Sequence, residues 1–116
     1  MKTFCFDLDG VICKTTKNFY KKSIPKKEVI SLINQLYRKN YILIYTSRYM
    51  GRSKENVKLA NKKGYSFTLK QLKRWGLKFH KLKFGKPSYD VFIDDKSFNF
   101  EKNWTKKFKL KFKKNL

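Results

Sequence analysis

Acidic residues are scarce in this chain. Its 116 residues include only 8 Asp and Glu against 30 Lys and Arg, which gives a formal net charge of +22. Such a charge predicts an anionic partner, for example phosphate groups, nucleic acid or an anionic surface. Arginine is scarce too, with 4 residues against 26 lysines, although arginine is the residue that binds phosphate in a bidentate manner. An AT-rich coding bias, which enriches lysine, is therefore as good an explanation of the charge as a functional anionic partner is.

Cysteines and long apolar runs are also rare. Cys5 and Cys13 form no CxxC motif, which argues against a disulfide scaffold or a zinc site and predicts a reducing, cytoplasmic environment. We expect Cys5 to face the core and Cys13 to follow a turn. No apolar stretch reaches the length of a membrane span. Charges interrupt the first apolar run, so no signal peptide is expected.

Apolar patterns alternate between strand and helix along the chain. The length fits one domain, and the sequence contains no repeat or linker. A continuous apolar run at residues 41–47 suits a strand covered on both faces, as in a parallel sheet. A flap or hairpin is expected at residues 11–24. The patterns predict an α/β domain with a mainly parallel sheet flanked by helices, with strands at 2–10, 41–47, 81–84 and 89–93 and helices at 25–40, 53–63 and 68–75.

The last residues, 98–116, form a basic tail. Within it "KKFKLKFKK" (106–114) alternates strictly between lysine and an apolar residue. A period of two predicts an edge strand with one lysine face. That face would serve either as a solvated edge that resists aggregation or as a surface for anions.

Four of the eight carboxylates occur as two close pairs. Asp7 and Asp9 lie in "FDLDG", and Asp94 and Asp95 lie in "VFIDDK". Crowding raises the cost of ionising both members of a pair, so each pair needs an explanation. A turn or helix cap is one explanation. A hard cation is the other, because Mg²⁺ takes carboxylate oxygens together with water and phosphate, and strand carboxyl ends bind ligands in open α/β sheets.

Other polar residues are expected at the same edge of the sheet. Thr46 and Ser47 end the strand that starts at Tyr41, where a hydroxyl and backbone N–H groups suit a phosphate oxygen. Lys86, in "FGKP", precedes the strand that carries the second acidic pair, and its ammonium would offset phosphate or nucleophile charge. Arg48 is either a substrate-binding residue or a surface arginine.

The order of these motifs resembles that of the haloacid dehalogenase (HAD) superfamily of phosphohydrolases. "DLDG" matches its first motif, "IYTSR" its second, Lys86 its third and "IDD" its fourth, within residues 3–99. More narrowly, "IYTSR" and "GKPSYDVFIDDK" resemble small capless phosphatases of capsule and surface-polysaccharide synthesis. The resemblance implies one Rossmann-like HAD domain over residues 1–116 without a separate cap domain. One departure is Val11, where many members of the superfamily carry Thr.

The resemblance also implies roles for the matched residues. Asp7 would be the nucleophile that forms an aspartyl phosphate. Asp9 would protonate the leaving alcohol and then activate water. Thr46 would hydrogen-bond the transferring phosphoryl group, and Lys86 would steady that group and Asp7, in keeping with phosphoryl transfer as positioning plus charge neutralisation.

A magnesium site is implied by the same resemblance. The Asp7 carboxylate, the Asp9 carbonyl and Asp95 would bind Mg²⁺ directly, with Asp94 as a further ligand or in the outer shell.

We therefore predict a Mg²⁺-dependent phosphomonoesterase acting on a small phosphorylated metabolite, such as a sugar phosphate in polysaccharide synthesis. Two alternatives stay open: a nucleic-acid end phosphatase, favoured by the charge and an open site, and a non-catalytic basic binding protein on the same fold. Intact Asp7 and Asp9 argue against the second alternative. A capless site also leaves room for a neighbouring subunit, so an oligomer is compatible with the sequence.

Overall fold

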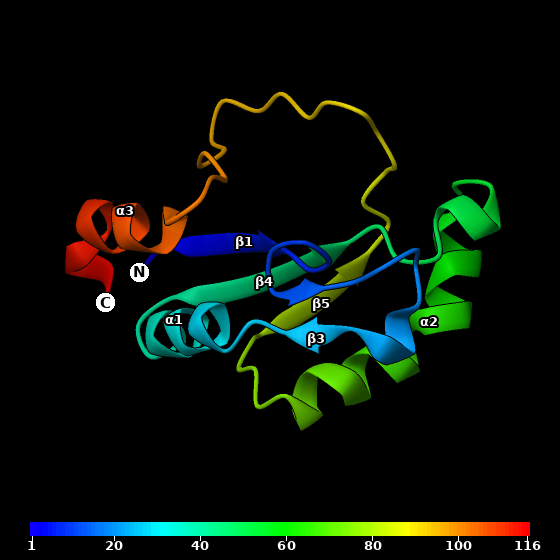
Figure 1. Cartoon of the computed structure of the whole chain (residues 1–116), viewed down its shortest axis with the longest axis horizontal. Helices are drawn as coiled ribbons and strands as arrows, with labels where there is room; N and C mark the ends of the chain where they lie inside the picture. The colour runs from blue at the N-terminus through cyan, green and yellow to red at the C-terminus, as the bar shows by residue number, and fades with distance from the viewer.

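The chain folds around a short parallel β-sheet. A computed structural model describes residues 1–116. Its three-stranded sheet has the order β1-β4-β5 and consists of β1 (Thr3–Asp7), β4 (Tyr41–Thr46) and β5 (Lys81–Phe84). Three helices accompany the sheet, as Figure 1 shows: α1 (Lys27–Tyr37), α2 (Val57–Arg74) and α3 (Trp104–Lys111). The predicted α/β class with a parallel sheet is confirmed.

A small hairpin lies between β1 and α1. Strands β2 (Cys13–Lys14) and β3 (Ile24–Pro25) pair antiparallel and enclose the short 3-10 helix η1 (Tyr20–Lys22). This hairpin, residues 11–25, is called the flap below. It agrees with the flap or hairpin predicted for residues 11–24.

One face of the sheet is buried and the other is partly open. Residues paired in register on parallel strands share a face, and the face with Phe4 is buried along all three strands: Phe4, Phe6, Ile42, Ile44, Thr46, Leu82 and Phe84. On the opposite face Cys5 is exposed and Leu43 is only half-buried. The expectation that β4 would be covered on both faces is therefore wrong, as is the expectation that Cys5 would face the core.

Helix α2 runs through Gly64, where the sequence predicted an end. A Cβ at residue 64 would collide with the Tyr49 ring, so the glycine lets this ring approach the helix closely and does not end the helix. The two helices predicted at 53–63 and 68–75 are therefore one. The helix ends before Gly76, whose φ of +76° suits glycine, as predicted. Between β4 and α2 lies the 3-10 helix η2 (Gly51–Ser53).

The basic tail is helical, so the predicted edge strand at 106–114 is wrong. α3 places Phe108 and Phe112 against Phe4 of β1, with ring centroids 5.5 and 5.2 Å apart respectively. Leu110, which an alternating strand would bury, is 79% exposed. The 3-10 helix η3 (Lys113–Asn115) follows α3.

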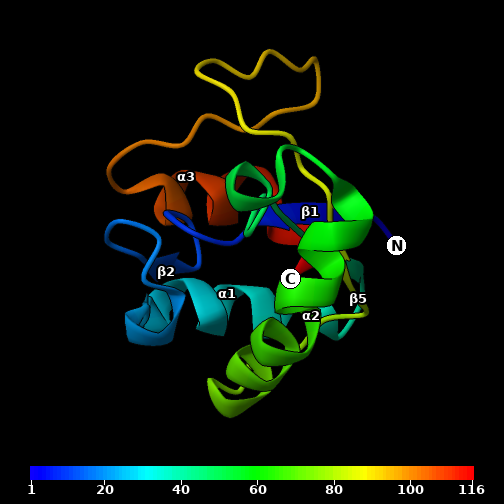
Figure 2. The same ribbon diagram turned by 90° about the vertical axis from the view of Figure 1, so that its right-hand side faces the viewer.

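The long loop, residues 85–103, joins β5 to α3 and contains no strand. Figures 1 and 2 show it standing out from the rest of the domain. The strand predicted at 89–93 does not form, and its apolar side chains, Val91, Phe92 and Ile93, are exposed. β1 consequently lies at an edge of the sheet. No helix in the structure has the length and apolarity needed to cross a membrane.

Candidate active site

Three predicted residues meet at one edge of the sheet. Asp7 is the last residue of β1, Thr46 is the last residue of β4, and Lys86 follows β5. The Lys86 backbone N–H donates to the Thr46 carbonyl at 3.1 Å. Parallel strands direct their carboxyl ends to the same edge, which is why residues distant in the sequence gather here.

The Asp7 carboxylate is held from two sides. Lys86 Nζ lies 3.3 Å from Asp7 Oδ2, and the Leu8 backbone N–H donates to Asp7 Oδ1 at 2.9 Å. Burial raises the pKa of the Asp7 carboxyl, and the nearby Lys86 ammonium opposes this effect without cancelling it. Asp7 is therefore a partly desolvated carboxylate paired with one cation.

Lys86 is a buried lysine in contact with two aromatic rings. Its side chain is 11% exposed, and Nζ lies 5.0 Å from the centroid of the Tyr89 ring and 5.7 Å from that of Phe92. Burial alone would lower the pKa of Lys86, but interactions with the Tyr89 hydroxyl and the Asp7 carboxylate raise it overall. Lys86 therefore stays charged at neutral pH, next to Asp7.

The Thr46 hydroxyl is buried and bonds within the turn that follows β4. Thr46 is buried, and its Oγ1 accepts a hydrogen bond from the Arg48 backbone N–H at 3.1 Å. The hydroxyl keeps its own proton for a further hydrogen bond, and no hydrogen bond joins it to Asp7 or Lys86. Ser47 is half-buried, and its carbonyl accepts from the Met50 N–H at 3.0 Å, which begins the turn after β4.

A tight turn places Asp9 after β1. The Leu8 carbonyl accepts from the Ile12 N–H at 2.9 Å, and the Gly10 N–H donates to the Cys13 carbonyl at 2.8 Å. Gly10 has a φ of +92°, which a residue with a side chain rarely adopts. The glycine of "DLDG" is thus required by the turn that presents Asp9.

Asp9 pairs with Arg48 rather than standing free. Arg48 Nε lies 2.9 Å from Asp9 Oδ2, and Nη2 lies 2.9 Å from Oδ1. The Arg48 side chain is fully buried, whereas that of Asp9 is 27% exposed. The substrate-binding role predicted for Arg48 does not agree with this placement, because its guanidinium points inward and already pairs with the Asp9 carboxylate.

The second acidic pair lies apart from this edge. Asp94 and Asp95 are exposed in the long loop. Asp94 Oδ1 accepts the Lys96 N–H at 2.7 Å, and its carbonyl accepts the Ser97 hydroxyl at 2.9 Å, so Asp94 stabilises a turn. No three acidic, histidine or cysteine side chains come together in the structure. Mg²⁺ often uses one or two carboxylates with several waters, so Asp7, without Asp94 and Asp95 beside it, fits only part of the predicted metal site.

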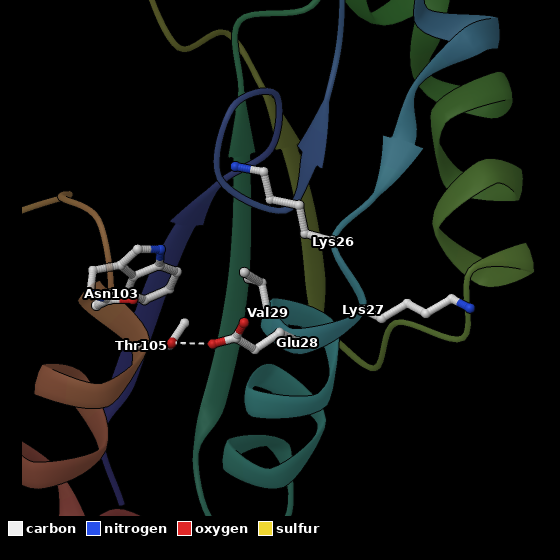
Figure 3. Close-up of a pocket in the computed structure, with 7 residues that line it drawn as sticks. Lys26, Lys27, Glu28, Val29, Asn103 and Thr105 are labelled. Atoms are coloured by element: carbon white, nitrogen blue, oxygen red, sulfur yellow. Dashed lines mark hydrogen bonds between the residues drawn. The ribbon is translucent and has the colours of Figure 1, made fainter.

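A cavity of about 360 Å³ lies elsewhere, between the start of α1 and the start of α3. Figure 3 shows the Thr105 hydroxyl, which donates a hydrogen bond to the Glu28 carboxylate in this cavity, and Lys26, which extends away from them. Lys26 Nζ donates to the Gly10 carbonyl at 2.7 Å. None of the predicted site residues lines this cavity, and Glu28 already occupies the end of α1 that would attract an anion.

Comparisons with known proteins support the fold alone. No protein-family model matches the sequence, and no curated protein matches it. A crystal structure of a structural genomics target from Vibrio cholerae is similar, with a TM-score of 0.79 over 96% of this chain and 99% of that chain, at 21% sequence identity. The whole chain therefore shares its fold with a protein of nearly the same extent.

Sequence reasoning missed the polar residues that surround Asp9 and Arg48. Thr15 and Ser23 come from the flap, and Gln71 comes from α2. The one available signal was Gln71 itself, a polar residue four positions before the helix end at Trp75 and beside apolar Leu72. No local pattern indicates that a residue at 48 would turn inward to bind them.

Proposed function

We propose that this protein is a phosphomonoesterase of the HAD type that forms an aspartyl phosphate on Asp7. The supporting observation is the meeting of Asp7, Thr46 and Lys86 at the carboxyl ends of three parallel strands, with Lys86 Nζ 3.3 Å from Asp7 Oδ2. A carboxylate, a hydroxyl donor and a cation are the groups that covalent phosphoryl transfer needs.

The first step transfers the phosphoryl group to the protein. An Asp7 oxygen forms a bond to phosphorus while the bond from phosphorus to the leaving oxygen breaks, and Asp9 supplies the proton that the leaving alkoxide needs. Thr46 donates to a phosphoryl oxygen, and Lys86 balances the charge that Asp7 and the phosphoryl group share. In the second step Asp9 takes a proton from water as the water oxygen bonds to phosphorus, which frees phosphate and the Asp7 carboxylate.

The proposal includes Mg²⁺ as the cofactor. Asp7 and the Asp9 carbonyl would hold it with Asp95 and Asp94, and the ion would neutralise charge on the phosphoryl oxygens. For that set to form, the long loop must carry its carboxylates to Asp7. Asp94 already affects the pKa of the Cys5 thiol on β1, although burial is the larger cause of the upward shift.

A small phosphorylated metabolite, such as a sugar phosphate, is the proposed substrate. The decisive experiment mixes the protein with Mg²⁺ and a panel of sugar phosphates and nucleotides, quenches with acid and digests the product. We expect a phosphate-sized increase in mass on the peptide that carries Asp7, absent in Asp7→Asn. Turnover that Asp7→Asn leaves unchanged would exclude the covalent route, and no turnover of any substrate would exclude the phosphatase.

A nucleic-acid end phosphatase is the second candidate, favoured by the lysines on the outer face of α3. Lys106, Lys107, Lys109 and Lys111 are all exposed there. An enzyme that contacts six or more phosphates should lose roughly a thousandfold in affinity between about 50 and 200 mM salt. We expect a shallow dependence instead, because a sugar phosphate presents one dianion.

Substitution of these lysines by glutamine is the appropriate variant for this question. Removal of residues 106–116 would also remove Phe108 and Phe112, which pack on β1, so a truncated chain would lose part of its core. The glutamine variant should keep its turnover of sugar phosphates. A steep salt dependence with phosphorylated oligonucleotides, abolished in that variant, would favour the nucleic-acid enzyme.

A further inference from the structure

Arg48 is the most completely engaged charged residue in the protein. Besides the two contacts with Asp9, its Nη1 donates to Gln71 Oε1 at 2.7 Å and its Nη2 donates to Ser23 Oγ at 3.3 Å. The Tyr20 ring centroid lies 4.6 Å from Cζ. Arg48 thus connects the turn after β1, the flap and α2 through one fully buried guanidinium.

An ion pair with one fully buried charge needs an explanation other than stability. Desolvation of both charges offsets much of their attraction, and apolar residues of similar volume often replace such a pair without loss. What a bidentate pair supplies is geometry, because two parallel hydrogen bonds fix the plane of the carboxylate. The contacts of Arg48 are therefore best explained by the orientation of Asp9.

The two oxygens of Asp9 have different surroundings. Oδ1 accepts from Arg48 Nη2 at 2.9 Å, from the Thr15 hydroxyl at 2.5 Å and from Cys13 Sγ at 3.4 Å. Oδ2 accepts only from Arg48 Nε, at 2.9 Å. A carboxylate oxygen has two lone pairs, so Oδ1 is saturated and Oδ2 keeps one lone pair free.

We propose that Arg48 is a positioning residue that holds Asp9 so that Oδ2 exchanges the proton with the leaving group and with water. The inference rests on the proposed phosphatase function, and it extends that function to a residue that does not touch substrate. Thr15 shares the task by occupying Oδ1. Gln71 holds the guanidinium from behind: its own Nε2 donates to the Tyr20 carbonyl at 2.7 Å, so the flap and α2 support the same geometry.

Leaving groups of different reactivity separate positioning from other roles. Dinitrophenolate leaves without needing a proton, whereas the alkoxide that leaves an alkyl phosphate needs one. We expect Arg48→Met to slow leaving-group release in a single turnover by about a hundredfold or more for the alkyl phosphate, the usual size of acid–base catalysis, and to change that rate for dinitrophenyl phosphate only slightly. A single turnover is measured because the later attack of water needs Asp9 with both substrates. KM should change little with either substrate. Arg48→Lys, which keeps the charge but not the bidentate fork, should fall between Arg48→Met and the wild type.

The double variant Asp9→Asn with Arg48→Met provides the control. If Arg48 acts through Asp9, the second substitution should add no further loss for the alkyl phosphate. If Arg48→Met does not fold, as judged by circular dichroism, Arg48→Lys in both backgrounds carries the same test. Equal losses for both leaving groups, or a rise in KM alone, would overturn the inference while the phosphatase stands. A wild-type protein inactive on both substrates would overturn the proposed function and the inference together.

Discussion

The two acidic pairs look alike in the sequence and differ in the fold. Asp7 and Asp9 end a strand whose neighbours are buried, and they face a lysine and an arginine at 3.3 and 2.9 Å. Asp94 and Asp95 follow apolar residues that are themselves exposed, and the hydrogen bonds of Asp94 stay within its own turn. The pair that follows a buried strand is held by two cations, whereas the pair that follows exposed residues is not.

Asp7→Asn should have the largest effect and would sharpen the comparison most. The amide keeps the size of the side chain but lacks the anionic oxygen that attacks phosphorus, so kcat/KM should fall by at least about a thousandfold. The matched control is Asp90→Asn, an exposed carboxylate of the long loop, which should retain activity. Hydrolysis of a general phosphatase substrate measures both, and similar losses in the two variants would contradict the assignment of Asp7.

Removal of Mg²⁺ tests whether the second pair joins the first. Chelation with EDTA should abolish turnover, and added Mg²⁺ should restore it and raise the thermal stability. Asp95→Ala should weaken Mg²⁺ binding more than Asp94→Ala, which should cost about tenfold as an outer-shell residue.

Isothermal titration with Mg²⁺ alone gives the order of these effects without relying on activity. Unchanged Mg²⁺ affinity in both variants would show that the two pairs stay separate.

Loss of a carboxylate should lower the free energy of unfolding more in the less exposed pair than in the exposed pair. Asp9→Ala leaves the buried Arg48 guanidinium without its carboxylate, which should cost about 2–4 kcal/mol, nearer the lower figure because the Asp9 side chain is 27% exposed. Asp94→Ala removes one exposed turn contact and should cost about 0.5 kcal/mol or less. Urea denaturation measures both free energies of unfolding. Equal values would indicate that Arg48 finds another partner or that the long loop is better anchored than its exposure indicates.

The elements with local signals were predicted correctly. The apolar stripe of α1 and the β-rich runs at β1, β4 and β5 can be recognised in the sequence because the apolar residues of these elements themselves form the core. The strand prediction for the tail was wrong because the alternating pattern placed Phe108, Leu110 and Phe112 on one face of a strand. Trp104 and Phe108 of α3 and Phe112 directly after it are spaced by four and face the domain, whereas Leu110 faces solvent. Packing against Phe4 selected the helical spacing over the period of two.

The site was predictable only in part, for the same reason. Strand ends indicated Asp7 and Thr46, and motif order indicated Lys86. The pairing of Arg48 with Asp9 joins residues 39 positions apart and depends on an inward turn after β4, which no periodicity encodes. The long loop shows the reverse case, because "YDVFI" has the composition of a strand but has no partner strand in this structure.

The alkylation rates of the two cysteine thiols test the two acidic pairs, and the changes expected here are the smallest. Cys13 lies beside Asp9, and burial raises its pKa to about 11. Cys5 lies on β1, where burial, and to a lesser extent Asp7 and Asp94, also raise the thiol pKa, but its residue is exposed. Because alkylation needs the thiolate, both rates should rise with pH, and Cys5 should react at least about tenfold faster than Cys13.

Asp94→Asn removes a negative charge that opposes ionisation of Cys5, so it should speed Cys5 labelling by up to about twofold and leave Cys13 unchanged. Mass spectrometry of iodoacetamide-treated protein resolves the two sites. Equal acceleration at both cysteines would mean that the substitution loosens the whole domain, and the independence of the two acidic pairs would then be lost.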